Sequence, residues 1–183
     1  MWRKFCGWLL RVLGWKAGEP VVPENKCIIL GVPHTSTWDF VISYLYYVSV
    51  GGKPYCMIKS EAFWGPLGWI LRKMGGIPVD RKRGSNVALS VINEMKKRDV
   101  VHLALAPEGT RQAVKRWKTG FHTIAREVGC PVYMGYFDWG TKTIGRGQKV
   151  ELTDDAKADM ARIQDLYEKM NLTAKHPDMY RTK

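Results

Sequence analysis

The chain has 183 residues, of which 45% are hydrophobic and 25% charged, so one domain can bury a core of ordinary size and global disorder is excluded. The net charge is +12, and the whole excess lies in residues 1–16, 72–83 and 111–118, each with four more basic than acidic residues. Such local patches indicate a polyanionic partner, which at this stage is an anionic lipid surface, a phosphorylated metabolite or a nucleic acid.

The cysteines and the hydrophobic runs exclude further classes of protein. The four cysteines form no CxxC pair and no His/Cys ligand spacing, so we expect buried thiols, no disulfide and no metal site. No stretch approaches 18 uninterrupted apolar residues, the length expected of a spanning helix. The basic, apolar start lacks a small-residue cleavage site, so we do not expect a cleavable signal peptide.

Residues 2–15 carry apolar side chains at helical spacing, with Arg3, Lys4 and Arg11 between them. Such a helix either lies in the headgroup region of an anionic membrane or docks on the core. Because every polar position is cationic and three positions are Trp, we favour the membrane. We therefore divide the chain into an amphipathic membrane-surface helix, 1–17, and a domain over 24–175.

Strands alternate with helices along the rest of the chain. We expect strands at residues 27–32, 55–58, 77–79, 100–106, 131–137 and 149–152. We expect helices at residues 38–47, 86–98, 120–128 and 155–171, with Thr35 or Ser36 capping the first and Ser85 the second. This alternation predicts a single α/β domain with a largely parallel central sheet flanked by helices, preceded by the amphipathic N-terminal helix.

A histidine and an aspartate follow the first of these strands. His34 lies directly after it, and Asp39 lies in the first turn of the next helix. Because His34 precedes the helix, its ring can fold back and donate from one nitrogen to the carboxylate, which leaves the other nitrogen as a base. No protein nucleophile is needed if a substrate hydroxyl attacks. A histidine at a helix start is more often a capping or packing residue, so this spacing alone identifies no site.

Two more strand ends carry charged groups. Glu108, Gly109, Thr110 and Arg111 follow the strand expected at 100–106 and bring an acid, a flexible residue and a cation to the edge of the sheet. Asp80-Arg81 ends the strand expected at 77–79. Read separately, the first segment also fits a tight turn with a Glu–Arg surface pair, and the second fits a solvated charge run.

In this order, the segments resemble the motifs of the glycerolipid acyltransferase family, of the lysophosphatidate (1-acylglycerol-3-phosphate) acyltransferase type. His34–Asp39 matches the first motif, Gly76–Arg81 the second and Pro107–Arg111 the third in full, while Cys130–Met134 matches the fourth in part. The sequence departs from the pattern at two places: Pro33 replaces an asparagine that often precedes the first motif, and Gly135 stands where the fourth often ends in proline.

The resemblance implies a glycerol-phosphate acyltransferase-like fold and an enzyme of phospholipid biosynthesis. It would move a fatty acyl group from an acyl-CoA or acyl-carrier-protein thioester to the hydroxyl of a lyso-phospholipid, by default 1-acylglycerol-3-phosphate. The resemblance implies no cofactor and no metal, because the thioester is already activated. We expect a cytoplasmic protein, peripheral on the inner face of the cell membrane, with an anionic membrane surface and no nucleic acid as partner.

The resemblance also assigns roles to residues. His34 would be the general base and Asp39 would orient it. The substrate-binding residues would be Arg81, Glu108, Gly109, Thr110 and Arg111, the two arginines holding the phosphate of the acceptor and Glu108 with Gly109 shaping the acceptor and oxyanion region.

Other interpretations stay open at this point. The acceptor can be an amino-acid lipid or another lyso-lipid, and the chain can be a catalytically silent membrane-binding module. The absence of a G-x-S-x-G segment disfavours a serine hydrolase. The apolar residues between 57 and 71 either line an acyl groove or belong to the core.

Overall fold

The computed structural model describes residues 1–80 and 86–182. The proposed phosphate ligand Arg81 and the proposed helix cap Ser85 lie outside the described residues.

The elements alternate along the chain much as the sequence predicts. The helices are α1 (Trp2–Val12), α2 (Thr37–Ser49), α3 (Gly65–Lys73), α4 (Asn86–Lys96), α5 (Gly120–Val128) and α6 (Ala156–Lys169), with short 3-10 turns at Ser60–Ala62 and Pro177–Met179. The strands are β1 (Lys16–Ala17), β2 (Lys26–Leu30), β3 (Pro54–Lys59), β4 (Gly76–Val79), β5 (Val101–Leu105), β6 (Val132–Tyr133), β7 (Tyr136–Asp138), β8 (Thr143–Gly145) and β9 (Lys149–Val150).

A six-stranded sheet of order β4-β3-β5-β2-β6-β9 forms the centre of the fold. All neighbouring strands in it are parallel except β6 and β9, which are antiparallel. The predicted α/β class with a largely parallel sheet is therefore confirmed. A small second sheet, of order β1-β8-β7, joins the end of α1 to the chain after β6.

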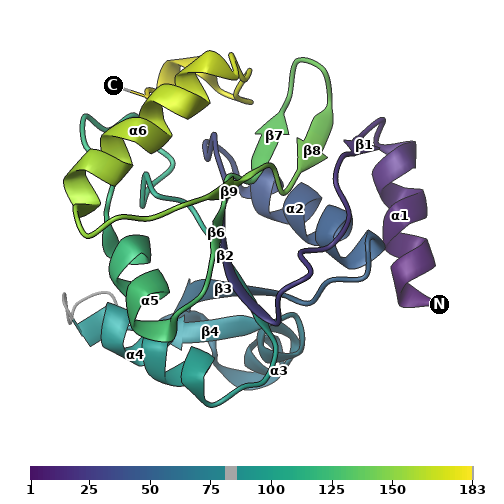
Figure 1. Ribbon diagram of the computed structural model, residues 1–183. Helices are drawn as coiled ribbons and strands as arrows, with labels where there is room; N and C mark the ends of the chain where they lie inside the picture. The colour runs from purple at the N-terminus through teal and green to yellow at the C-terminus, as the bar shows by residue number, and fades with distance from the viewer. Residues whose placement is uncertain (81–85, 183) are drawn as a thin grey trace.

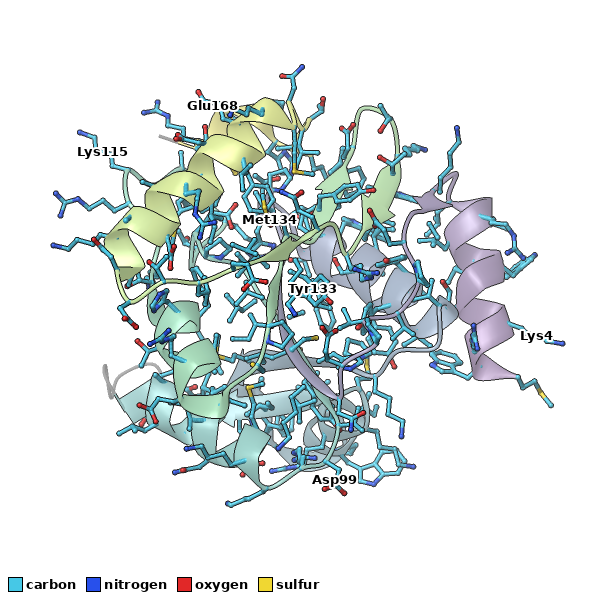
Figure 2. The ribbon with its side chains drawn as sticks, viewed as in Figure 1. Lys4, Asp99, Lys115, Tyr133, Met134 and Glu168 are labelled. Carbon is cyan, nitrogen blue, oxygen red and sulfur yellow. The ribbon has the colours of Figure 1, made fainter. Side chains whose placement is uncertain are left out.

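Helices cover both faces of the large sheet, because alternate residues of its strands are buried on opposite sides. On β2, Ile28 and Leu30 pack in the core with α4, α5 and α6, whereas Cys27 and Ile29 pack with α1 and α2. Figure 1 shows these helix groups on opposite sides of the sheet. The neighbours Tyr133 and Met134 lie near the centre of Figure 2 and belong to different clusters, which makes the two-sided core visible.

The N-terminal helix forms as expected over Trp2–Val12 and packs on α2 through buried Cys6 and Leu10. Leu9 is partly buried against the same cluster, whereas Trp2, Phe5, Trp8 and Val12 are exposed. In the described part of the chain, no helix has both the length and the apolar run that crossing a bilayer requires.

Three local expectations were wrong. The predicted strand 131–137 is divided into β6, which pairs in the large sheet, and β7, which pairs with β8 in the small one. Gly135 lies between them and approaches Leu30 so closely that a Cβ there would lie 2.5 Å from the Leu30 carbonyl oxygen. Helix α3 was not foreseen in a segment rich in Gly, Pro and Trp. Of the four free cysteines, Cys56 and Cys130 are partly exposed rather than buried.

Candidate active site

The loops after β2 and β5 bring the first and third motifs together. The two strands are neighbours, with Leu30 opposite Leu105, so both loops leave the same edge of the sheet at the same level. The backbone N–H of His34 donates to Oε1 of Glu108 at 2.9 Å. This contact joins residues 74 positions apart and places a base and an acid at the carboxyl edge of the sheet, where α/β folds bind ligands.

His34 and Asp39 face each other as the sequence predicts. Nδ1 of His34 lies 3.5 Å from Oδ2 of Asp39; the His34 side chain is 27% exposed and that of Asp39 only 1%. The imidazole is thus open to a substrate on one side, while the carboxylate is held inside the protein. This arrangement fixes which ring nitrogen faces the carboxylate and leaves Nε2 for proton transfer.

The start of α2 explains why Asp39 stays in place. Ser36 caps the helix by accepting from the backbone N–H of Trp38, and Asp39 completes a capping box by accepting from Ser36. Oδ2 of Asp39 accepts the backbone N–H groups of Thr35 and Ser36, both at 2.7 Å. Two short charge-assisted hydrogen bonds on one oxygen stabilise the ionised carboxylate at the positive end of the helix.

Oδ1 of Asp39 has a partner that no sequence pattern predicts. The indole Nε1 of Trp139, just after β7, donates to it at 2.8 Å. The Trp139 ring packs edge-on against Trp15, with ring centroids 4.9 Å apart. Both carboxylate oxygens are therefore hydrogen-bonded, and Trp139 is the residue that fixes the outer one.

Glu108 is almost completely buried and has an unusual acidity. Burial raises the pKa of its carboxyl to about 7, against the hydrogen bond from His34 N–H, which lowers it. Its second oxygen, Oε2, is buried without a hydrogen-bond partner in the described structure. A carboxyl that titrates near neutral pH and has one free oxygen can accept from, or donate to, a polar group of a bound ligand.

The turn after Glu108 brings a further cation to the site. Gly109 adopts φ 68°, and its N–H donates to the Ala106 carbonyl, so this amide is already engaged within the turn. A Cβ on Gly109 would lie 2.8 Å from the Lys118 side chain, which lies against the turn. Lys118 belongs to the basic segment 111–118 but was not singled out from the sequence, because nothing local connects it to Gly109.

The remaining residues that the sequence predicts to bind substrate lie only partly together in the structure. The Arg111 guanidinium is exposed and donates to the Thr37 hydroxyl at the start of α2, which puts it at the rim of the site. The Thr110 hydroxyl accepts the N–H of Gln112 within the turn. Asp80 follows β4, which is separated from β5 by β3, so two strand spacings, about 10 Å, divide the second motif from the third.

The segment after α6 returns to this edge of the sheet. The N–H of His176 donates to the Thr35 hydroxyl, and the N–H of Trp139 donates to the Thr173 carbonyl. Lys175 lies over the ring of Trp139, with Nζ 4.5 Å from the ring centroid. Lys175 is therefore a second cation that the sequence does not predict at the site, and it lies next to Trp139, which holds Asp39.

A second histidine–aspartate pair, His122 with Asp159, has a different character. Nε2 of His122 lies 3.1 Å from Oδ2 of Asp159, and both side chains are buried. The Thr153 N–H and the Arg162 guanidinium also donate to this carboxylate. Because this pair lies between α5 and α6, away from solvent, we interpret it as a structural link. Among residues 1–80 and 86–182, His, Cys, Asp and Glu form no cluster of three that could hold a metal ion.

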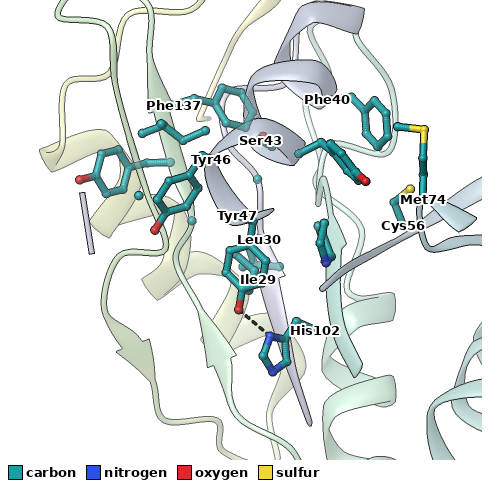
Figure 3. A pocket seen from close by; sticks show the side chains of 18 residues that line it. Ile29, Leu30, Phe40, Ser43, Tyr46, Tyr47, Cys56, Met74, His102 and Phe137 are labelled. Atoms are coloured by element: carbon teal, nitrogen blue, oxygen red, sulfur yellow. Dashed lines mark hydrogen bonds between the residues drawn. The ribbon is translucent and has the colours of Figure 1, made fainter. Parts of the chain in front are cut away.

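An apolar cavity of about 70 Å³ lies between the sheet and α2, the helix that carries Asp39. Gly31, Phe40, Tyr44, Cys56 and Met74 contribute to its lining, and Figure 3 shows Phe40 close to Met74. Within its lining, the Tyr47 hydroxyl and Nδ1 of His102 are 2.7 Å apart and satisfy each other, as Figure 3 shows. A cavity of this volume has room for only a short piece of an apolar chain.

Comparison with known proteins agrees with this geometry. The model of the Acyltransferase family matches residues 16–134, and the chain belongs to this family. A 1-acyl-sn-glycerol-3-phosphate acyltransferase from Streptococcus pneumoniae is 32% identical over 100 residues, which cover 52% of this chain and 36% of that relative. The aligned stretch thus spans about a third of the relative's length.

The fold also has a solved counterpart. The crystal structure of the 1-acyl-sn-glycerophosphate (LPA) acyltransferase from Thermotoga maritima aligns with a TM-score of 0.65 and 17% identity. The alignment covers 96% of this chain and 80% of that one. At this identity the likeness confirms the fold, including the regions on both sides of the family match.

Proposed function

We propose that this protein is an acyltransferase that moves a fatty acyl group from an acyl-CoA or acyl-carrier-protein thioester to the hydroxyl of a lyso-phospholipid, with 1-acylglycerol-3-phosphate as the first candidate. The observation that carries the proposal is the open His34 ring beside buried Asp39, 3.5 Å apart, at the same sheet edge as Glu108. The S. pneumoniae relative is a 1-acyl-sn-glycerol-3-phosphate acyltransferase, which supports the choice of acceptor.

In this mechanism Nε2 of His34 takes the proton of the acceptor hydroxyl while the oxygen attacks the thioester carbonyl carbon. Asp39 stabilises the imidazolium that results, because its carboxylate lies against Nδ1. The tetrahedral intermediate then collapses with cleavage of the C–S bond, and the leaving thiolate takes the proton from His34. Acceptor oxygen, acyl carbon and thiol are the reacting atoms, and no acyl-enzyme forms.

The surrounding residues support binding of an anionic acceptor. Arg111 at the rim and Lys118 beside Gly109 are cations within reach of the same edge, and Arg can bind a phosphate through two parallel hydrogen bonds. The unpartnered Oε2 of Glu108 is suited to a hydroxyl of the acceptor. Since the Gly109 N–H is engaged in its turn, we assign stabilisation of the oxyanion to Lys118, which lies against this turn, and the phosphate contact to Arg111.

The proposal includes action at an anionic membrane, on the cytoplasmic face of the cell membrane, in phospholipid biosynthesis. Exposed Trp2, Phe5 and Trp8 on α1, together with the cations of this helix, support lipid contact. The apolar cavity beside α2 supports a substrate with a hydrocarbon chain. We assign no cofactor and no metal to the reaction, because the thioester supplies the activated acyl group.

The test uses purified protein, labelled acyl-CoA or acyl carrier protein, and a panel of lyso-lipids in anionic vesicles, with products identified by mass spectrometry. We expect an acylated lyso-phospholipid that Asp39→Asn abolishes. Asp178→Asn is a matched control, because that carboxylate is exposed in the segment 177–179. Vesicle binding without turnover from any thioester would instead favour a catalytically silent membrane-binding module.

A further inference from the structure

The two helix layers differ in the side chains that they expose. Thirteen large hydrophobic side chains are exposed among the described residues, and nine of them belong to α1, α3 and the residues that precede these helices, Met1 and Trp64. In the described part of the opposite layer, Leu89 of α4 and Met170 at the end of α6 are the only large hydrophobic side chains that are exposed. One face of the molecule is therefore much more apolar than the other.

Helix α3 lies on the same face of the sheet as α1 and α2. Cys56 of β3 lines the cavity together with Phe40 of α2, and Ile58 points the same way because it is two residues further along the strand. A Cβ on Gly76 would touch both Ile58 and Phe63, which precedes α3. Since α1 packs on α2 and α2 covers this face, α1, α2 and α3 all lie on the same side of the sheet, with α3 next to β4 in Figure 1.

The outer surface of α3 is not that of an ordinary helix on a soluble protein. From Trp64 to Ile70 only Gly68 is buried, so Trp64, Leu67, Trp69 and Ile70 face solvent. No acidic residue lies in its first turn, and its last turn is basic. Exposed apolar surface of this extent normally marks an interaction site.

The cations of α3 lie directly against its aromatic rings. Nζ of Lys73 is 3.9 Å from the centroid of the Trp69 ring, and the Arg72 guanidinium carbon is 5.1 Å from that of Phe63. Trp with an adjacent cation is typical of the interface between lipid headgroups and acyl chains, where the ring is half wet and the cation meets phosphate.

Helix α2 completes the surface without adding charge. The only charged residue of α2 is Asp39, which is buried. Partly exposed Phe40, Val41, Tyr44 and Val48 are all apolar or aromatic. The cavity lies beneath this helix, and Met74, which ends α3, forms part of its wall.

We propose that α3 is a second contact site for an anionic lipid bilayer, so that the α1–α2–α3 layer rests on the membrane with the apolar cavity close to the lipid. The inference rests on the proposed action at a membrane surface and extends it from α1 to a second helix. An acyl chain would then move between the bilayer and the cavity along α2 and α3 without crossing water.

Charge favours a bilayer over other occupants of this surface. Of the three basic segments, 1–16 contains α1 and 72–83 begins in the last turn of α3. Apolar and cationic groups therefore occur together at both helices. A second copy of this chain would bring the same cations against each other across a two-fold interface. An acidic carrier protein would match the cations but would leave most of the exposed Trp and aliphatic side chains without a partner.

The test is co-sedimentation of the full chain with phosphatidylcholine vesicles, with and without phosphatidylglycerol. We expect Leu67→Ser combined with Trp69→Ser to weaken partitioning about tenfold or more. The matched control is Leu89→Ser, since Leu89 is 57% exposed on the opposite layer and Leu67 is 46% exposed on α3. Lys73→Glu should weaken binding only to the phosphatidylglycerol vesicles, and the thermal unfolding midpoints should stay unchanged because these side chains are exposed.

Three results would overturn the proposal. One is equal partitioning of the α3 variants and Leu89→Ser. The second is a wild-type dimer, seen by ultracentrifugation, that the α3 variants dissociate without losing vesicle binding. The third is that the α3 variants lose binding to an acyl carrier protein but keep vesicle binding.

Acyl transfer to a short-chain acceptor dispersed in water is measured alongside vesicle binding. This assay needs no membrane, so it tests the enzymatic function separately from the membrane contact at α3. If the wild type transfers no acyl group but its vesicle binding depends on α3, the membrane surface stands and the enzymatic function fails. If the wild type transfers acyl groups but its vesicle binding does not depend on α3, the enzymatic function stands and the membrane surface at α3 fails.

Discussion

Trp139 donates its indole N–H to Oδ1 of Asp39 at 2.8 Å, across one hundred residues of sequence. Trp139 lies outside the stretch matched by the family model, 16–134, whereas Asp39 lies inside it. A residue beyond the family motifs thus holds the carboxylate that faces His34. The Thr35 and Ser36 amides fix the other oxygen, so the Asp39 side chain has little freedom to turn.

The first prediction concerns this hydrogen bond. Trp139→Phe keeps an aromatic ring against Trp15 but leaves Oδ1 of Asp39 without its donor. A hydrogen bond to a charged group contributes about 1.5–3 kcal/mol, so we expect kcat to fall roughly tenfold or more while KM changes little. Steady-state kinetics with thermal unfolding measures both. Trp15→Phe is the control, and equal kcat values in the two variants would contradict a positioning role for Trp139.

The second prediction follows from the pKa of Glu108, which burial raises to about 7. Between the unfolded value near 4.5 and this folded value, the folded protein keeps a proton that the unfolded chain loses. The contribution of Glu108 to stability therefore falls as pH rises through this window, by up to about 3 kcal/mol.

Glu108→Gln removes this titration, because the amide has the same shape and no charge. We expect the variant to gain stability relative to the wild type between pH 5 and pH 8, as measured by urea denaturation. A stability difference that is the same at both pH values would show that Glu108 does not titrate in this range.

Arg111 is the subject of the third prediction. It is exposed at the rim and donates to Thr37, so Arg111→Ala removes a cation without opening the core. We expect KM for a lyso-phospholipid acceptor to rise about tenfold, with a much smaller effect on an uncharged monoacylglycerol acceptor. Arg116→Ala, an exposed arginine of the same loop, serves as the control. Equal effects on both acceptors would rule out a phosphate contact.

The fourth prediction separates the two histidine–aspartate pairs. Burial alone would raise the pKa of Asp159, but hydrogen bonds from Arg162, Thr153 and His122 outweigh it, and the pKa is lowered. The folded value therefore lies below the unfolded value, so the stabilisation is present above the unfolded pKa and is lost as pH falls through the folded one.

Asp159→Ala leaves His122 and the Thr153 amide without this acceptor, and we expect it to cost about 3 kcal/mol of stability or more. At a temperature where the variant is folded, kcat should stay within about twofold of the wild type, because the pair lies between α5 and α6. A large loss of kcat without loss of stability would place His122 or Asp159 in the reaction.

The sequence predicts the parts of this site that are close along the chain. His34 and Asp39 are five residues apart and are joined by a capping box, so local rules bring them together. The alternation of strands and helices also predicts that Glu108 lies at the same edge of the sheet as His34, because the carboxyl ends of parallel strands meet at one edge. It does not predict that β2 and β5 are neighbours, since β3 and β4 come between them in the chain.

Contacts between distant segments were not predictable in this way. An indole N–H has no sequence pattern that connects Trp139 to Asp39, and the same holds for Lys118 against Gly109. Helix α3 was missed because Gly65, Pro66 and Gly68 are residues that usually end helices. In the structure Pro66 lies in the first turn, where its missing N–H costs nothing, and Gly68 is buried against the Phe63 backbone, where a Cβ would lie 2.5 Å from it.

The most direct test of the account is the turnover of His34→Ala. The side chain of His34 contacts only Asp39 among the polar groups described, and an alanine keeps the backbone N–H that donates to Glu108, so the fold should be unaffected. Loss of a general base is expected to lower kcat by about 10²–10⁴. The control is His176→Ala, since His176 reaches Thr35 only through its backbone N–H and its side chain is exposed. Acyl transfer by His34→Ala at the wild-type rate, measured by mass spectrometry of the lipid product, would contradict the role of His34 as the base.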